Sequence, residues 1–252
     1  MRVTTLQRND FLENYWSPDA GEHVNIISPT GGGKTHLMYQ LAEGFANRYP
    51  DLSYCTFLPK PEDETTERWA KQLGYKTAED WPPRKRWFEE KPNGYVLWPP
   101  HNIEDEQANR EHLEGVFERA FNRQYGQGNS VTMVDDAYVI GVLYGLNPLL
   151  DRHWIAGRSS GASLFTTLQK PSGTTGGAVS SFAYDSPTHL FLGRDNDERN
   201  LKRFSEIAAS GIDPDQLRDI VRNLPVHRIG NSAVSDMLYL DRRGPYLAII
   251  TV

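Results

Sequence analysis

The stretch Ser28-Pro-Thr-Gly-Gly-Gly-Lys-Thr35 decides the fold, because it joins the apolar run His23-Val-Asn-Ile-Ile-Ser28 to a segment with helical periodicity. Apolar residues recur every four positions after Lys34 and predict a helix that ends at about Arg48. Three consecutive glycines allow backbone N–H groups to turn inward around phosphate oxygens, and the start of a helix adds the positive end of its dipole. A strand, a glycine-rich loop and a helix in this order predict a phosphate-binding loop for a nucleoside triphosphate.

The residues of this loop have distinct expected roles. Lys34 is expected to reach the β- and γ-phosphates, and the hydroxyl of Thr35 to coordinate Mg²⁺. Ser28 stands where the usual motif has its first glycine, a place that a serine can take. We therefore expect ATP and Mg²⁺ as ligands. The expected nucleotide-binding residues are Ser28, Thr30, Gly31, Gly32, Gly33, Lys34, Thr35 and His36.

Two further predicted strands end in polar residues. The run that begins at Ser130 ends in Asp135 and Asp136, and the run that begins at Ala162 ends in Gln169. A magnesium nucleotide site needs a carboxylate at a neighbouring strand end, a role that fits Asp135 together with Thr35 as metal ligands. Asp136 is then placed to orient or deprotonate an attacking water, and Gln169 to sense the γ-phosphate or hold that water. Alternatively, the acids cap a helix or face solvent, and the glutamine is an ordinary hydrogen-bonded residue.

The composition restricts the class of protein. The 252 residues carry a net charge of −6, which excludes a uniformly basic surface, so any contact with nucleic acid must be local. No apolar run approaches the roughly 18 residues of a membrane-spanning helix, and the first residues lack a secretion signal. The single cysteine, Cys55, cannot form an internal disulfide, which fits a cytoplasmic location.

Strands alternate with helices along the chain and predict an α/β fold with three layers, in which helices cover both faces of a mainly parallel sheet. We expect a single domain over residues 1–252 with its core at about 22–205. Residues 59–93 are expected to form an excursion on the surface. Residues 206–252 are expected to add a helix and a β-hairpin over Asp236–Val252.

Two segments are candidates for contact with DNA. Residues 59–93 are rich in proline and charge, and their Arg84-Lys85-Arg86 cluster lies in sequence between Trp81 and Trp87, a composition that can meet a phosphate backbone. The alternative is a solvated loop held by its tryptophans. The Gly/Ser-rich loop from Lys170 to Ser181 either lines a DNA channel or is merely flexible.

Several of these features together resemble the FtsK–HerA superfamily of ring-forming, DNA-pumping ATPases. They are the phosphate loop, the strand that ends in two acids, the stretch Gly157-Arg158-Ser-Ser-Gly161-Ala-Ser163, and Thr166-Thr-Leu-Gln-Lys-Pro171. The resemblance covers about residues 22–205 and implies a RecA/ASCE-like P-loop fold. The superfamily more often has Glu as the second acid, where this chain has the shorter Asp136.

The resemblance implies an ATP hydrolase that moves double-stranded DNA. Such rings usually complete the site with an arginine from the neighbouring subunit, for which Arg158 is the best candidate and Arg152 and Arg194 are alternatives; any of them can instead be a surface ion pair. A compact chain with no membrane segment looks most like the viral and phage genome-packaging ATPases. That likeness implies a pentameric or hexameric ring on a portal or capsid vertex, in the host cytoplasm or the virion.

Other classes of function stay open. A plasmid or conjugation-type DNA-pumping ATPase fits the same motifs. A small-molecule P-loop kinase would also explain Lys34, Thr35 and Asp135, with the arginines between Arg194 and Arg203 as a lid. A nucleotide-dependent switch without motor activity is a third possibility.

Overall fold

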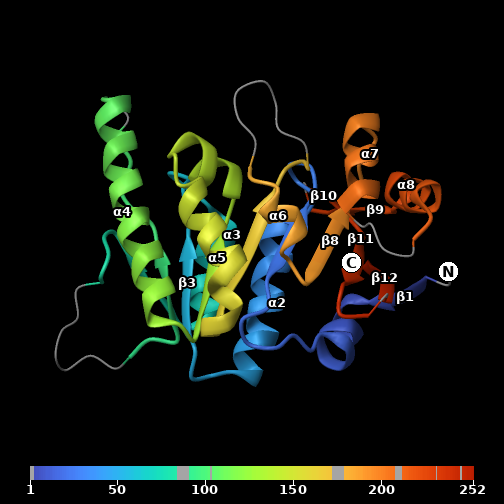
Figure 1. The fold of residues 1–252 in the computed structure, drawn as a ribbon, viewed down its shortest axis with the longest axis horizontal. Helices are drawn as coiled ribbons and strands as arrows, with labels where there is room; N and C mark the ends of the chain where they lie inside the picture. Colours follow the sequence, from blue (N-terminus) through green and yellow to red (C-terminus); the bar gives the residue numbers. More distant parts are fainter. Residues whose placement is uncertain are drawn as a thin grey trace.

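A ten-stranded sheet forms the centre of the computed structural model (Figure 1). The structure describes residues 3–83, 91–102, 104–171, 179–207, 212–230, 232–244 and 246–252. In order across the sheet, the strands are β1 (Thr4–Gln7), β12 (Tyr246–Thr251), β11 (Met237–Asp241), β8 (His189–Gly193), β2 (Val24–Ile27), β7 (Ala162–Leu168), β6 (Ser130–Val134), β3 (Ser53–Phe57), β5 (Gly94–Leu97) and β4 (Tyr75–Ala78). A separate antiparallel pair consists of β9 (Val226–Ile229) and β10 (Ser232–Ser235).

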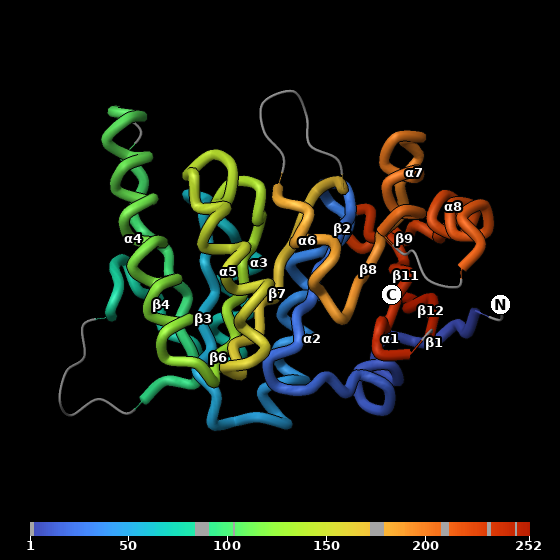
Figure 2. Tube along the Cα trace, in the orientation of Figure 1, coloured from blue at the N-terminus to red at the C-terminus, as the bar shows by residue number. Residues whose placement is uncertain are grey.

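The sheet is mainly parallel, as predicted. From β8 to β4 every neighbouring pair of strands is parallel, whereas β11 is antiparallel to both β8 and β12. The predicted C-terminal hairpin is therefore confirmed, and it extends the central sheet. Strand β1 pairs with β12 in parallel, so the first and last strands of the described chain lie side by side at one edge of the sheet (Figure 2).

Helices cover both faces of the sheet, which confirms the three-layer α/β fold. One apolar core lies beneath α2 (Lys34–Arg48), α3 (Glu64–Leu73) and the turn η1 (Phe11–Tyr15). The other lies beneath α4, α5, α7 and α8. The remaining bounds are α1 (Arg8–Asp10), α4 (Glu106–Gln127), η2 (Val139–Leu143), α5 (Asn147–Ala156), η3 (Gly157–Ser160), α6 (Phe182–Asp185), α7 (Glu198–Ile207) and α8 (Pro214–Asn223).

The sheet order determines where the polar strand ends meet. Strand β7 lies between β2, which leads into the phosphate loop, and β6, which ends at the two acids. All three strands are parallel, so their carboxyl ends lie on the same side of the sheet, which we call its carboxyl edge. This edge therefore brings together the loop, the acid pair and Gln169.

The expected surface excursion at 59–93 is corrected in part. Strand β4 pairs with β5 as the edge of the central sheet, and α3 packs over the core. Trp69 and Trp81 are buried. Strand β4 could not be recognised in the sequence, because the segment is rich in proline and charged residues and only the two end residues of the strand, Tyr75 and Ala78, are buried.

Some expectations fall on residues outside the description. The Arg84-Lys85-Arg86 cluster and Trp87 lie there, as does most of the loop from Lys170 to Ser181. The sheet also extends beyond the expected core of 22–205, because β1, β11 and β12 belong to it. Across the described ranges, no helix combines the length and apolar character needed to cross a bilayer.

Candidate active site

The phosphate loop follows β2 directly and ends where α2 begins at Lys34. Gly31 and Gly33 have φ angles of 81° and 84°, a backbone conformation that favours glycine. A Cβ atom at Gly32 would lie 2.1 Å from Ser28 Oγ, so only glycine lets the loop close over this serine. The glycine run thus wraps the backbone around the start of α2, as a phosphate cradle requires.

Lys34 lies against its own loop. Its Nζ donates to the carbonyl oxygens of Ser28 and Pro29, at 2.7 and 2.9 Å. Burial lowers the pKa of Lys34 to about 8, although the carboxylates of Asp135 and Asp136 act in the opposite direction. A partly desolvated ammonium that lines the cavity is a strong anchor for an anion.

Asp135 is buried next to the first turn of α2. Its Oδ1 accepts from Thr35 Oγ1 at 2.9 Å and from Thr167 Oγ1 at 3.0 Å. Its Oδ2 accepts from Lys60 Nζ, which also bonds to Asp63. Although burial acts against it, the carboxylates of Asp135 and Asp63 raise the pKa of Lys60. Asp135 is therefore held by neutral hydroxyls on one oxygen and by a cation on the other.

Asp136 adopts a left-handed backbone conformation, with a φ angle of 65°. Its N–H donates to Thr167 Oγ1 at 2.9 Å, and its Oδ2 accepts from Gln169 Nε2 at 2.9 Å. Oδ1 is buried and has no hydrogen-bond partner among the described residues. A non-glycine residue with positive φ at a pocket is a form of backbone strain that clusters at functional sites. Oδ1 therefore has the capacity to accept one more hydrogen bond.

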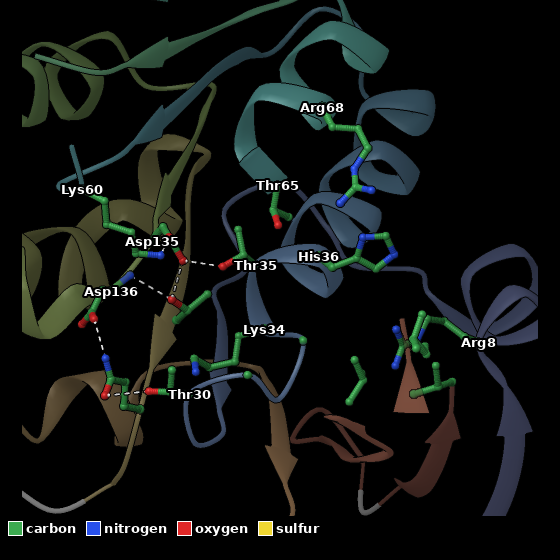
Figure 3. Close-up of a pocket in the computed structure, with 17 residues that line it drawn as sticks. Arg8, Thr30, Lys34, Thr35, His36, Lys60, Thr65, Arg68, Asp135 and Asp136 are labelled. Atoms are coloured by element: carbon green, nitrogen blue, oxygen red, sulfur yellow. Dashed lines mark hydrogen bonds and ion pairs between the residues drawn. The ribbon is translucent and has the colours of Figure 1, made fainter. Parts of the chain in front are cut away.

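Gln169 joins Asp136 to Thr30 of the phosphate loop, two residues that Figure 3 labels. While its amide nitrogen donates to Asp136, its Oε1 accepts from Thr30 Oγ1 at 3.3 Å. Gln169 therefore connects Thr30 of the phosphate loop to the carboxylate of Asp136 through one side chain.

These residues line one cavity of about 580 Å³, which continues past His36. His36 Nδ1 accepts from Trp69 Nε1 of α3 at 3.0 Å. Burial, together with the positive charges of Arg8 and Arg68, lowers the pKa of His36. Val234 of the β9–β10 pair packs against the loop, since a Cβ atom at Gly33 would lie 2.7 Å from its Cγ1. This half of the cavity is lined by Arg8, His36, Thr65, Arg68, Ile229, Val234 and Val252.

Solved structures share this arrangement of elements. The genome packaging NTPase B204 of Sulfolobus turreted icosahedral virus 2, in complex with AMPPCP, has a TM-score of 0.57 and 15% identity; the match covers 92% of this chain and 98% of that one. VirB4 of Thermoanaerobacter pseudethanolicus has a TM-score of 0.64 and 11% identity, over 94% of this chain and 91% of that one.

A third match is the cytoplasmic domain of the Type VII secretion ATPase EccC of Thermomonospora curvata. Its TM-score is 0.58 at 13% identity, over 96% of this chain but 26% of that one. No protein-family model and no curated protein matches the sequence. The fold is that of a P-loop ATPase.

The matches bear out the predicted resemblance at the level of the fold, over nearly the full length of this chain. Its cavity is lined by most of the predicted site residues. They are Thr30, Gly31, Gly33, Lys34, Thr35, His36, Asp135, Asp136 and Gln169. Ser28 and Gly32 belong to the loop but not to the lining, and Ser28 contributes its carbonyl oxygen to Lys34.

None of the candidate arginines lines this cavity. Arg158 precedes β7 and therefore lies at the amino ends of the parallel strands, away from the phosphate loop. Its Nη2 is 3.8 Å from Glu22 Oε1, and its side chain is 68% exposed. Arg152 donates to Asn122 Oδ1 at 2.7 Å, and Arg194 makes a 3.5 Å contact with the carbonyl of Leu224. No arginine from the predicted set therefore reaches the phosphate loop of its own chain.

Several side chains at the site were not predicted, and four of them make the contacts that matter most here. Lys60 and Thr167 contact Asp135, Trp69 holds His36, and Arg8 lines the far half of the cavity. Thr167 had a usable signal, because it lies two residues before Gln169 on the same strand. Lys60 also follows a strand, β3, whose carboxyl end lies beside that of β6. For Trp69 and Arg8, the sequence gives no comparable indication that they belong to the site.

The donor set fits a hard divalent cation. Thr35 Oγ1 and Asp135 Oδ1 lie 2.9 Å apart and face the cavity beside the phosphate loop. Within the described ranges, no group of three or more acidic, histidine or cysteine side chains could hold a metal alone. Mg²⁺ is commonly held by one or two protein oxygens together with phosphate oxygens and water, so the site suits a metal that arrives with a nucleotide.

Proposed function

We propose that this chain is an ATP hydrolase that moves double-stranded DNA as a ring and packages a viral or phage genome. The observation that carries the hydrolytic part is the pairing of Asp136 with Gln169 opposite the phosphate loop. The nearly full-length match to the viral genome packaging NTPase supports the packaging role. Structures of that NTPase in complex with AMPPCP and with ATP-gammaS support ATP as the nucleotide.

The chain's own residues account for each step of hydrolysis. The loop amides and the start of α2 would bind the phosphates, and Lys34 would contact the β- and γ-phosphates. Thr35, and Asp135 through water, would hold Mg²⁺, which supplies neutralisation of the phosphate charge. Asp136 would orient the attacking water and accept its proton at the free Oδ1, while Gln169 keeps the carboxylate aligned with the γ-phosphate.

A ring would explain the position of Arg158. The exposed guanidinium lies at the amino ends of the parallel strands, opposite its own phosphate loop, so in a ring it would act on the site of a neighbouring subunit. An arginine supplied in trans stabilises the charge that develops on the transferred phosphoryl group. Mixing Arg158→Ala subunits with wild-type subunits should therefore inhibit ATP turnover more steeply than simple dilution. Inhibition in proportion to the mutant fraction would place the arginine elsewhere.

The proposal is tested by ATP hydrolysis with and without double-stranded DNA, together with particle size measured in the presence of both ligands. We expect DNA to stimulate hydrolysis, with a stimulation that falls as salt rises, and we expect a pentamer or hexamer. A protein that stays monomeric and hydrolyses ATP at the same rate with and without DNA would count against the proposed DNA-moving function. Transfer of phosphate to a small acceptor would instead identify a kinase.

The matches to VirB4 and EccC favour a second candidate, an ATPase of a secretion or conjugation system. Such an ATPase would share the site described above. The two candidates separate on assembly: a packaging motor should bind a portal or capsid-vertex protein, in the host cytoplasm or on the virion. Binding to components of a membrane-bound channel in place of such a protein would favour the second candidate.

A further inference from the structure

Arg8 is a buried cation in the half of the cavity that lies farthest from the acid pair. It begins α1 immediately after β1, and the pairing of Gln7 with Thr251 places it next to the end of β12. Its side chain lines the cavity, and only 7% of the residue is exposed. In Figure 3, Arg8 lies on the far side of His36 from Asp135 and Asp136.

Within the described part of the chain, the buried guanidinium of Arg8 lacks hydrogen-bond acceptors for two of its nitrogen atoms. Nε and Nη2 are both buried, and neither has a hydrogen-bond partner among the described residues. The nearby opposite charge is that of Asp236, which attracts Arg8 less strongly than burial disfavours its charge. Asp236 Oδ1 already accepts from His227 Nε2 at 2.7 Å and from Val252 N at 3.0 Å. Buried polar atoms are almost always hydrogen-bonded, and a buried charge left unpaired costs several kcal/mol. Two unsatisfied donors on one edge of a guanidinium therefore point to a ligand.

The direction in which a nucleotide would lie in the cavity indicates which part of it would contact Arg8. The γ-phosphate end is defined by Thr30, Asp136 and Gln169, and the loop amides lead from there to the start of α2. The nucleoside must then leave the loop on the side of His36. The apolar side chains of Ile229 and Val234 line that side and suit the face of a base.

We propose that Arg8 binds the nucleoside of the nucleotide by donating from Nε and Nη2 to two neighbouring acceptor atoms. This inference rests on the proposed binding of a nucleoside triphosphate. The ribose offers such a pair in its 2′ and 3′ oxygens. Guanine offers another in O6 and N7, whereas adenine presents N7 beside a donor amine, so a base contact would favour guanine.

Calorimetric titration with four ligands tests the proposal. The ligands are ATP, 2′-deoxy-ATP, GTP and inorganic tripolyphosphate, each with Mg²⁺. We expect Arg8→Met to weaken ATP binding about tenfold, because a charge-assisted contact is lost, while tripolyphosphate binding changes less than about twofold. Weaker binding of 2′-deoxy-ATP to the wild type would assign the contact to the ribose, and tighter binding of GTP would assign it to the base.

Three results would overturn the inference. They are an equal loss of ATP and tripolyphosphate affinity in Arg8→Met, no loss at all, and a wild type that binds all three nucleotides alike. Arg110→Met, which removes an exposed arginine of α4, is the matched control and should bind all four ligands as the wild type does. If the wild type binds no ATP, the proposed function itself fails. If the wild type binds ATP and Arg8→Met binds it equally well, the proposed function stands and this inference alone fails.

A second variant separates a ligand contact from a structural role. Arg8→Lys keeps the charge but loses the paired donors, so its affinity for ATP should stay close to that of Arg8→Met. Recovery of wild-type affinity in Arg8→Lys would contradict a two-donor contact. The melting temperature of ligand-free Arg8→Met should not fall, because the substitution removes a buried charge whose desolvation outweighs its attraction to Asp236. A clear fall would assign Arg8 to the fold.

Discussion

The two halves of the cavity are built in different ways. At the phosphate half, polar side chains bond to one another: Asp135 to Thr35 and Thr167, and Asp136 to Gln169. At the nucleoside half, Arg8 contributes buried donors that no described residue satisfies. The phosphate half is thus preorganised before any ligand binds, whereas the nucleoside half leaves its strongest donors for the ligand.

The origin of the two halves in the chain explains this difference. Neighbouring parallel strands β2, β7 and β6 position the phosphate half, and their hydrogen-bonded register fixes the spacing of the side chains at their ends. The nucleoside half draws on β1, α3, the β9–β10 pair and the end of β12, which are far apart in sequence. A sheet edge determines one half, and packing between distant segments determines the other.

Removal of the loop lysine should have the largest effect. Lys34→Ala deletes the cation that we place at the β- and γ-phosphates, and we expect ATP turnover to fall at least about 100-fold, with ATP binding weakened as well. Steady-state phosphate release and calorimetry with ATP measure the two effects. Lys71→Ala removes an exposed lysine of α3 and should leave both unchanged. Turnover near the wild-type rate in Lys34→Ala would refute the assignment of the phosphate half.

Loss of the carboxylate at Asp136 should separate chemistry from binding. Asp136→Asn keeps the size of the side chain but removes the base, so we expect turnover to fall about 100-fold while ATP affinity stays within about twofold. Asp136→Glu restores a carboxylate, at the length that the FtsK–HerA superfamily more often uses, and should recover most of the rate. Normal turnover in Asp136→Asn would show that another group accepts the proton.

Truncation of Gln169 should have a smaller effect at the same half. Gln169→Ala breaks the link between Thr30 and Asp136 but leaves both groups in place, so we expect kcat to fall about tenfold with little change in KM. Steady-state kinetics over a range of ATP concentrations gives both constants. Gln107→Ala on α4 removes an exposed glutamine as a control. A rise in KM without a fall in kcat would make Gln169 a binding residue instead.

The phosphate half could be predicted from the sequence because its signals are local. A glycine run between a strand and a helix, and strands that end in Asp135, Asp136 and Gln169, can each be read within about ten residues. The parallel arrangement then brings these ends to one edge without further information. The helix predicted after Lys34 and the C-terminal hairpin were also predicted correctly for this reason.

The rest depends on tertiary contacts that leave little trace in the sequence. Arg8 is an ordinary charged residue until β1 pairs with β12 and buries it. Strand β4 is four residues long, within a segment dominated by prolines and charges, so its place at the sheet edge was missed. Lys60 became part of the site only because β3 pairs with β6 and places it against Asp135.

The smallest predicted effect lies at the nucleoside half. Trp69→Phe removes the indole N–H that donates to His36 Nδ1 but retains a ring that can stack on Tyr39, as the indole does. The hydrogen bond contributes about 0.5–1.5 kcal/mol to holding His36 in place, so its loss should weaken ATP binding by at most about two- to tenfold. Tripolyphosphate affinity should not change, since the substitution leaves the phosphate half intact.

A tryptophan at the other half provides the matched control for this variant. Trp98 Nε1 donates to the carbonyl oxygen of Lys60 at 2.7 Å, so Trp98→Phe loses a hydrogen bond of the same kind near the acids. Its ratio of ATP affinity to tripolyphosphate affinity should equal that of the wild type, whereas the ratio in Trp69→Phe should fall. A fall in tripolyphosphate affinity that matches the fall in ATP affinity in Trp69→Phe would mean that the halves are not independent, because a change next to His36 would then affect the whole cavity.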